Sequence, residues 1–105
     1  MTSTYICIES EFLPLQDAAW AAWMEAGETY TDHVKEAQDE ADAHRVFVQN
    51  NGFVRSLIHF CDEDQRIEPH KLPYLFAEAS VLKLKDEKVL IARAMELGQP
   101  VYLSY

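Results

Sequence analysis

The stretch that decides the fold comprises residues 73–98, PYLFAEASVLKLKDEKVLIARAMELG, which residues 99–105, QPVYLSY, follow directly. Apolar residues recur there every three or four positions, which predicts a first helix that buries one face: Leu72, Leu75, Phe76, Ala79 and Leu82. Asp86 is the expected N-cap of a second helix, whose predicted apolar side comprises Val89, Leu90, Ala92, Arg93 and Leu97. Gly98 should end this helix in a left-handed conformation, and Pro100 prevents its continuation.

Two short β-prone runs lie at opposite ends of the chain. Residues 4–8, TYICI, and residues 101–105, VYLSY, are rich in β-branched and aromatic side chains. A lone strand leaves its backbone N–H and C=O groups unpaired, so we expect the two runs to pair in a small sheet. The predicted fold class is therefore α+β and mostly helical, with about four to five helices, and we expect residues 1–105 to form a single compact domain.

Two further helices are predicted in the first half of the chain. The first begins near Pro14 and stops at Gly27, and it carries a stripe of small residues: Leu15, Ala19, Ala22 and Ala26. The second covers about residues 31–48, with an inner face that comprises Tyr30, Val34, Ala37, Ala41 and Val48. The small-residue stripe of the first helix allows close packing of another element against it.

Residues 53–61, FVRSLIHFC, fit either a helical stripe or the face of a strand. The Asn-Gly pair at residues 51–52 is a strong hairpin signal, so residues 45–50 and 53–60 would pair as strands in the second alternative. We favour the helix. Residues 62–71, DEDQRIEPHK, are predicted to form a polar loop.

Charge is distributed unevenly along the chain. The net charge is −9, with 18 acidic residues against nine lysines and arginines. Residues 45–105 carry equal numbers of acids and bases, so the whole excess lies in residues 1–44, where Lys35 is the one base. The acids of this segment are Glu9, Glu11, Asp17, Glu25, Glu28, Asp32, Glu36, Asp39, Glu40 and Asp42. Such a negative field opposes direct binding of nucleic acid or of an anionic membrane, and it favours a protein partner with a basic surface.

Acidic residues of the second predicted helix share one face, opposite its inner side. They are Asp32, Glu36, Asp39 and Glu40 at spacings of i, i+4, i+7 and i+8, with Glu28 and Asp42 as extensions. The acids from residue 32 to residue 42 fall on about 15 Å of helix, which gives about one charge per 3 Å, close to the roughly 3.4 Å per phosphate of one DNA strand. We interpret this face as a partner-binding surface; the alternative is a solvated face that serves only solubility.

Trp20, Trp23 and Met24 form a bulky stripe beside the small residues of the first helix. Tryptophan is enriched at binding hot spots, which makes Trp20 and Trp23 candidates for the partner-binding surface. In a chain of this size we favour core positions for both rings. An exposed Trp20/Trp23 side would otherwise serve as the interface of a homo-oligomer.

Motifs for catalysis are absent from the sequence. There is no glycine-rich phosphate loop and no GxSxG elbow, so we expect a protein that is not an enzyme. Cys7 and Cys61 match no zinc-ribbon spacing, and we expect no cofactor and no bound metal. One alternative from a different class remains, a small metal-dependent enzyme, because four side chains that can bind metal crowd one region: His59, Cys61, Asp62 and His70.

The start of the sequence has no basic segment, and no apolar run is long enough to cross a bilayer, so we expect a cytoplasmic protein without membrane contact. In size, acidity and lack of catalytic motifs, the chain resembles the small inhibitor proteins of phages and mobile elements, including anti-CRISPR and DNA-mimic proteins. This resemblance is one of composition. Our leading hypothesis, which rests on the charge pattern, is a non-enzymatic protein whose acidic helix docks on a basic, nucleic-acid-binding surface of a partner protein and blocks it. Two alternatives are a toxin-neutralising immunity protein and a structural or assembly subunit.

Overall fold

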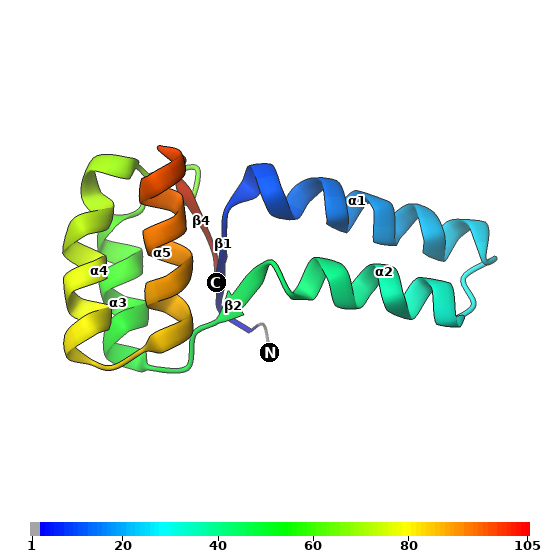
Figure 1. The fold of residues 1–105 in the computed structure, drawn as a ribbon, viewed down its shortest axis with the longest axis horizontal. Helices are drawn as coiled ribbons and strands as arrows, with labels where there is room; N and C mark the ends of the chain where they lie inside the picture. The colour runs from blue at the N-terminus through cyan, green and yellow to red at the C-terminus, as the bar shows by residue number, and fades with distance from the viewer. Residues whose placement is uncertain (1–2) are drawn as a thin grey trace.

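The computed structural model describes residues 3–105, which are coloured along the chain in Figure 1. They form five α-helices, one short 3-10 helix and four strands. In chain order these are β1 (Tyr5–Cys7), α1 (Glu9–Glu25), α2 (Asp32–Asp42), β2 (Arg45–Phe47), α3 (Asn51–Phe60), β3 (Arg66–Ile67), η1 (Pro69–Lys71), α4 (Leu72–Val81), α5 (Lys85–Leu97) and β4 (Val101–Ser104). The predicted fold class, α+β and mostly helical, is confirmed.

The four strands form one antiparallel sheet in the order β2-β1-β4-β3. The predicted pairing of the terminal strands is confirmed, because Ile6 of β1 lies opposite Leu103 of β4. On its other side β1 pairs with β2, where Ile6 lies opposite Val46. The strands β2 and β3 are therefore the two edges of the sheet.

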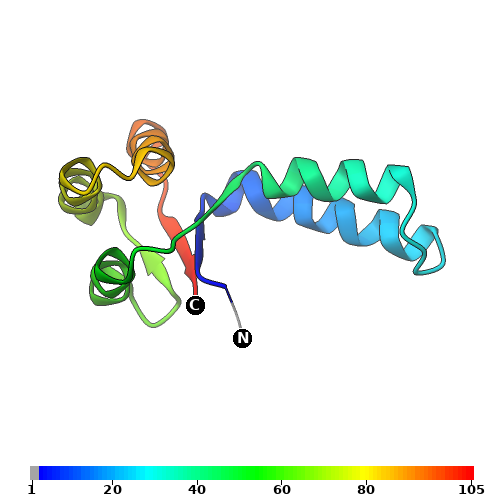
Figure 2. The same ribbon diagram turned by 90° about the horizontal axis from the view of Figure 1, so that it is seen from below.

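Helices cover the two faces of the sheet unequally. The helices α3, α4 and α5 enclose the main core on one face, which includes Ile6, Phe53, Leu75, Ile91 and Leu103. A smaller cluster contains Cys7, Phe12 and Ala41, from β1, α1 and α2. Figure 2 shows α3, α4 and α5 on one side of the sheet and the pair α1 and α2 extending from the other.

The pair α1 and α2 forms an antiparallel helical hairpin that projects from the sheet (Figure 1). The molecule measures 44 × 27 × 25 Å along its principal axes, and its radius of gyration is 14.8 Å. A compact domain of this length has a radius of gyration of about 13 Å. The difference reflects the hairpin, whose distal half lies beyond the sheet.

The helix α1 begins earlier than predicted. It starts at Glu9 and contains Pro14, which was the expected first residue. The carbonyl of Ile8 accepts the N–H groups of Glu11 and Phe12 at 3.0 and 2.9 Å, so the first turn closes before the proline. Phe12 is only 2% exposed, and its burial stabilises this turn.

The helix α2 ends earlier than predicted. It stops at Asp42, and the β-prone residues Arg45–Phe47 form β2 because β1 offers them a ladder of backbone hydrogen bonds. The alternative hairpin is wrong, since β2 pairs with β1 and not with the segment that follows. The favoured helix at that segment is confirmed as α3, whose first turn is capped by Asn50: its Oδ1 accepts the N–H of Phe53 at 3.0 Å.

The helix α5 buries a different face from the predicted one. Ile91 is fully buried, whereas Val89 and Leu97 are 62% and 45% exposed. Apolar residues occur on more than one side of this helix, so its periodicity does not select a unique buried face. Its N-cap is Leu84, which provides no side-chain hydrogen bond, and the predicted N-cap Asp86 lies in the first turn.

The last third of the chain ends α5 as predicted but contains elements where a loop was expected. Gly98 ends α5 with a φ of +64°, as predicted. The segment 62–71 was expected to be a loop, but it contains β3 and η1. Ile67 is fully buried and pairs with Val101, and the N–H of Leu103 bonds to the carbonyl of Gln65 at 2.8 Å, so burial of one apolar side chain and backbone pairing bring this polar run into the sheet. Within the described part of the chain, no helix is both long and apolar enough to span a membrane.

Candidate functional site

Arginines of the main body fasten the base of α1. Glu11 accepts hydrogen bonds from Nε and Nη2 of Arg93 in α5, at 2.8 and 2.7 Å. Glu9, at the start of α1, forms an ion pair with Arg66 of β3. These bonds join residues 82 and 57 positions apart, so they fix the direction in which the hairpin leaves the sheet.

Small side chains let the two helices of the hairpin pack closely. Ala22 of the predicted small-residue stripe is buried, and so are Val34 and Ala41 of the predicted inner face. Tyr30 does not belong to that face, because it is 59% exposed, and Val48 lies beyond α2 in the main core.

Thr31 caps α2, because its Oγ1 accepts the N–H of Val34 at 3.3 Å. At the tip Gly27 and Glu28 have φ values of +63° and +60°. The left-handed conformation costs a residue other than glycine about 1–2 kcal/mol, so this turn is held by the packing of the two helices.

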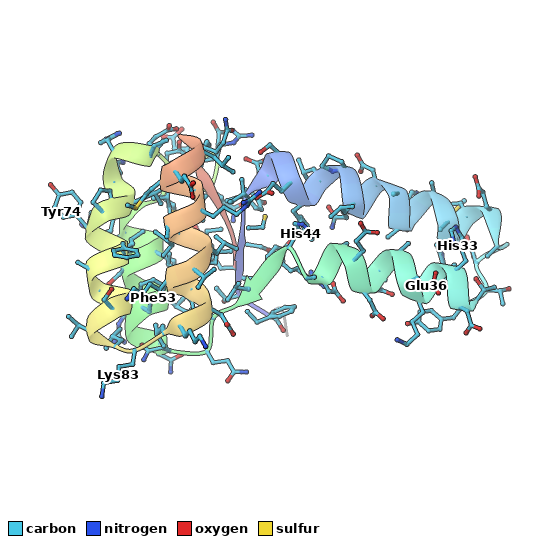
Figure 3. The ribbon with its side chains drawn as sticks, viewed as in Figure 1. His33, Glu36, His44, Phe53, Tyr74 and Lys83 are labelled. Carbon is cyan, nitrogen blue, oxygen red and sulfur yellow. The ribbon has the colours of Figure 1, made fainter. Side chains whose placement is uncertain are left out.

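The predicted acidic face lies on the solvent side of α2. Asp32, Glu36, Asp39 and Glu40 are all exposed, and Figure 3 shows Glu36 on the distal half of the hairpin. Asp39 forms an ion pair with Lys35 at 2.7 Å, and Asp42 forms one with Arg45 at 2.6 Å. The other four predicted acids have no ion pair within residues 3–105: Glu28, Asp32, Glu36 and Glu40.

Asp17 and Glu25 belong to the predicted negative field but not to the predicted partner-binding surface. Both are exposed residues of α1, and neither has an ion pair with another described residue. The hairpin therefore presents six unpaired carboxylates: Asp17, Glu25, Glu28, Asp32, Glu36 and Glu40. The signal for the two additional residues was the segment charge, because residues 1–44 contain a single base.

Trp20 and Trp23 border a groove between α1 and α2. The groove has a volume of about 350 Å³ and is lined by Phe12, Gln16, Ala19, Trp20, Trp23, Tyr30, Val34, Gln38, Ala41, Asp42 and Arg45. Trp20 is 64% exposed, so the favoured core position is wrong for Trp20; Trp23 is half-buried. A hairpin of two helices has one interface, and no third helix within residues 3–105 covers the bulky stripe that lies beside it. Met24 and Tyr30 are exposed as well.

Arg45 joins the base of α2 to the sheet. Its guanidinium carbon lies 4.9 Å from the ring centre of Tyr5, 4.8 Å from that of Phe47 and 5.6 Å from that of Phe12. Cation–π contacts of this kind are worth about 0.5–1 kcal/mol at exposed sites and more where they are desolvated. Because Asp42 binds the same guanidinium, Arg45 connects α2, α1, β1 and β2 at one point.

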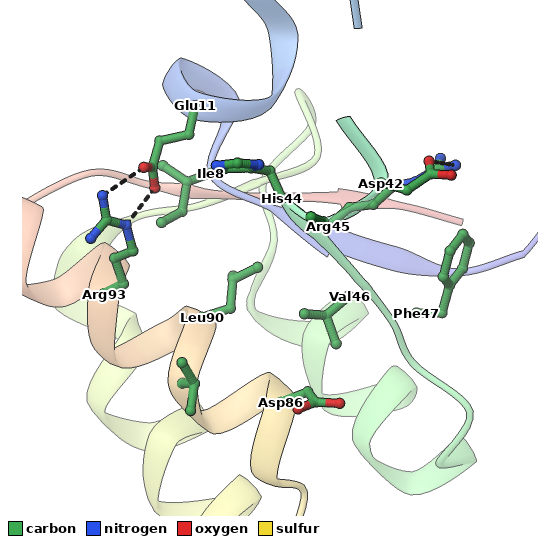
Figure 4. A pocket seen from close by; sticks show the side chains of 12 residues that line it. Ile8, Glu11, Asp42, His44, Arg45, Val46, Phe47, Asp86, Leu90 and Arg93 are labelled. Carbon is green, nitrogen blue, oxygen red and sulfur yellow. Dashed lines mark hydrogen bonds and ion pairs between the residues drawn. The ribbon is translucent and has the colours of Figure 1, made fainter. Parts of the chain in front are cut away.

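A second cavity of about 700 Å³ lies between β2 and α5 (Figure 4). Its lining residues are Ile8, Glu11, Asp42, Ala43, His44, Arg45, Val46, Phe47, Asp86, Val89, Leu90 and Arg93. Four of its charged side chains belong to the Glu11–Arg93 and Asp42–Arg45 ion pairs. Asp86 is the lining carboxylate that has no ion pair with any of residues 3–105.

Cys61 and Asp62, two of the candidate metal ligands, make structural hydrogen bonds. Oδ1 of Asp62 accepts the N–H groups of Asp64 and Arg66 at 2.9 and 3.0 Å, which closes the turn into β3. The thiol of Cys61 donates to the carbonyl of Ile58 at 3.2 Å. Across the described residues, no group of three His, Cys, Asp or Glu side chains is arranged to hold a metal ion.

The hairpin carries both unpaired carboxylates and an exposed indole ring. This combination suits lysine and arginine side chains, which pair with carboxylates and stack on tryptophan. Comparison of the chain with protein-family models, with curated proteins and with solved structures found no match.

Proposed function

We propose that the protein is a small, non-enzymatic inhibitor that docks its acidic hairpin on a basic, nucleic-acid-binding surface of a partner protein. The observation that carries this proposal is the division of the acids. The three acids at the base of the hairpin, Glu9, Glu11 and Asp42, form ion pairs with arginines of the body. The unpaired acids belong to α1, to α2 and to the turn between them, and all are exposed, so a partner can reach them.

The unpaired acids destabilise the isolated hairpin slightly. Asp32, Glu36 and Glu40 follow one another at i, i+4 spacing, and each such like-charge pair costs a few tenths of a kcal/mol. Contact with a basic surface removes this repulsion, and the long-range attraction speeds association. Trp20 lies on α1, three residues from the unpaired Asp17, and borders the groove between the helices. It supplies apolar area that slows dissociation, as buried tryptophans do at binding hot spots.

The shape of the hairpin suits a surface that otherwise holds nucleic acid. The 17 residues of α1 span about 26 Å at 1.5 Å per residue, which is the length of several phosphate spacings along one strand. Because the hairpin extends from the sheet, it can enter a concave basic groove that the broader body would not fit.

The experiment is a pull-down from the source cell with wild-type protein and two charge-reversal variants. Glu36→Lys/Glu40→Lys changes the hairpin, and Glu63→Lys/Glu96→Lys makes the same charge change on exposed acids of the body. We expect the wild type and the body variant to capture one partner that salt elutes, and the hairpin variant to lose it. The captured partner should bind nucleic acid, and added wild-type protein should displace that nucleic acid.

Full capture and full inhibition by the Glu36→Lys/Glu40→Lys protein, with its fold intact by circular dichroism, would end the proposal. Capture of a single toxin whose activity does not involve nucleic acid would replace it with the immunity-protein alternative. In that case the hairpin variant would lose protection against that toxin only.

A further inference from the structure

The outer edge of β2 is open. The N–H of Val48 bonds to the carbonyl of Thr4 at 2.9 Å, and in an antiparallel ladder such hydrogen-bonded positions alternate. Val46 therefore directs its backbone groups at β1 in the same way. The N–H and C=O groups of Arg45 and Phe47 point away from β1, and no segment within residues 3–105 pairs with them.

The cavity between β2 and α5 lies beside this open edge (Figure 4). Val46, Val89 and Leu90 give it an apolar lining, and Val89 is 62% exposed. Its volume of about 700 Å³ falls within the range of about 300–1,000 Å³ that is typical of ligand sites. An added strand would thus gain both backbone hydrogen bonds and an apolar pocket for one of its side chains.

The charge of the cavity beside β2 favours a basic ligand. Asp86 is the cavity carboxylate that lacks an ion pair among the described residues, and the whole protein carries a net charge of −9. A second copy of the chain would bring the same negative charge, which opposes its approach. A segment with a lysine or arginine beside an apolar residue is complementary to this cavity.

We propose that an extended basic segment of another protein adds to β2 as a further antiparallel strand. Its residue opposite Val46 would be apolar and would pack on Val89 and Leu90. Alternate residues of a strand lie about 6.7 Å apart, and Asp86 lies about 6 Å along α5 from Leu90, so the residue two positions away would be a lysine or arginine that faces Asp86. This mode of recognition is β-strand addition, and it uses a surface separate from the distal acids of the hairpin.

The test uses a pentapeptide, acetyl-Lys-Thr-Val-Thr-Lys-amide, whose symmetric sequence presents a valine flanked at two residues by lysines. Its threonine backbone groups would face Arg45 and Phe47. Amide hydrogen exchange of the ¹⁵N-labelled protein, measured by NMR, should show protection of these two N–H groups at about 1 mM peptide, a concentration that detects weak complexes. A control peptide with both threonine nitrogens methylated has the same charge but lacks the donors, and we expect it to give no protection.

Variants of the protein distinguish backbone pairing at the edge of β2 from non-specific electrostatic attraction of the peptide. Phe47→Pro removes the outward N–H at an edge position that tolerates proline, whereas Phe47→Ala removes the same ring and keeps the N–H. We expect loss of peptide protection at Arg45 in the first variant and its retention in the second. Asp86→Asn tests the site without changing the backbone, and it should weaken peptide binding about threefold, as expected for the loss of one exposed ion pair.

Several outcomes would overturn the proposal. One is equal binding of the methylated peptide, and another is a set of shifts confined to the hairpin, since both would mean attraction by charge alone. An unchanged affinity in Asp86→Asn would contradict the proposed contact between Asp86 and a lysine or arginine of the added strand. Protection of Arg45 and Phe47 that rises with protein concentration in the absence of peptide would assign the edge to a second copy.

Discussion

Glu11 of α1 and Arg93 of α5 form a two-point contact in which Nε and Nη2 of the arginine donate to the two carboxylate oxygens at 2.8 and 2.7 Å. The hydrogen bond from Arg93 is the main cause that holds the pKa of Glu11 below its usual value of 4.5. The pair connects the hairpin to the helix that packs on the opposite face of the sheet. It therefore couples the orientation of the acidic surface to the ionisation of one glutamate.

Glu11→Gln should lower stability at neutral pH and have a much smaller effect in acid. Because the folded state depresses the pKa of Glu11, the pair contributes stability above the unfolded value of 4.5, and this contribution is lost as the pH falls through the folded value. Urea unfolding at pH 7 and at about pH 3 measures the difference. Asp17→Asn, at an exposed and unpaired position of the same helix, is the control and should show little effect at either pH. An equal loss for Glu11→Gln at both pH values would contradict the assignment.

Glu36→Gln/Glu40→Gln should leave the protein as stable as the wild type or slightly more stable. The two side chains are an i, i+4 like-charge pair without ion-pair partners in the described structure, so neutralising them gains a few tenths of a kcal/mol. Thermal unfolding at low salt measures this gain, which should shrink at about 1 M salt because screening weakens the repulsion. A destabilisation comparable with that of Glu11→Gln would show that these acids are structural.

The two tryptophans should behave differently. Trp20 is 64% exposed, so Trp20→Ala should change stability by about 0.5 kcal/mol or less, whereas Trp23→Ala should cost more because that ring is half-buried. Acrylamide should quench the fluorescence of the Trp23→Ala protein, which retains Trp20, more strongly than that of Trp20→Ala. For the partner of the proposed function, we expect Trp20→Ala to weaken binding at least about tenfold, the size of a hot-spot effect. Equal quenching in the two variants would contradict the exposure of Trp20.

Cys7 should be inert to thiol reagents until the protein unfolds. Burial is the main cause that raises its pKa from 9.0 to about 12. At pH 8 only about one Cys7 thiol in 10⁴ would be ionised at that pKa. Below pH 9 the thiol is protonated in both states and does not change stability; as the pH rises from 9 towards 12 the unfolded thiol ionises first, so the free energy of unfolding falls. Reaction with a chromogenic disulfide in the Cys61→Ser variant isolates Cys7, and its labelling rate should follow global unfolding in urea. Rapid labelling under native conditions would show that β1 opens locally.

Several features of the molecule were decided by local sequence. Gly98 stops α5 because it adopts the left-handed conformation without a Cβ penalty, and Pro100 blocks a further turn. The spacing of Asp32, Glu36 and Glu40 places these acids opposite Val34 in any regular helix, and the structure has them on the solvent side. The β-propensity of residues 4–8 and 101–105 is local as well, although their pairing as β1 and β4 joins the two ends of the chain.

Other features depended on contacts between distant parts of the chain. Residues 45–47 form a strand only because β1 is beside them, and a continuous helix would otherwise satisfy the same backbone groups. Which of the acids meet an arginine was also beyond the sequence, since Glu11 and Arg93 are 82 positions apart and their encounter needs the whole sheet in place.

The position of Trp20 shows the same division. Helical periodicity correctly placed it in a stripe beside the small residues, but periodicity states only which side chains share a face. Whether that face is core or surface depends on how many elements pack around the helix. Among the described residues, the part of α1 that extends past the sheet packs on α2, so the indole meets solvent. Local periodicity determines the faces of each element, and only the tertiary arrangement decides which faces are covered, because burial is a property of neighbours that are distant in sequence.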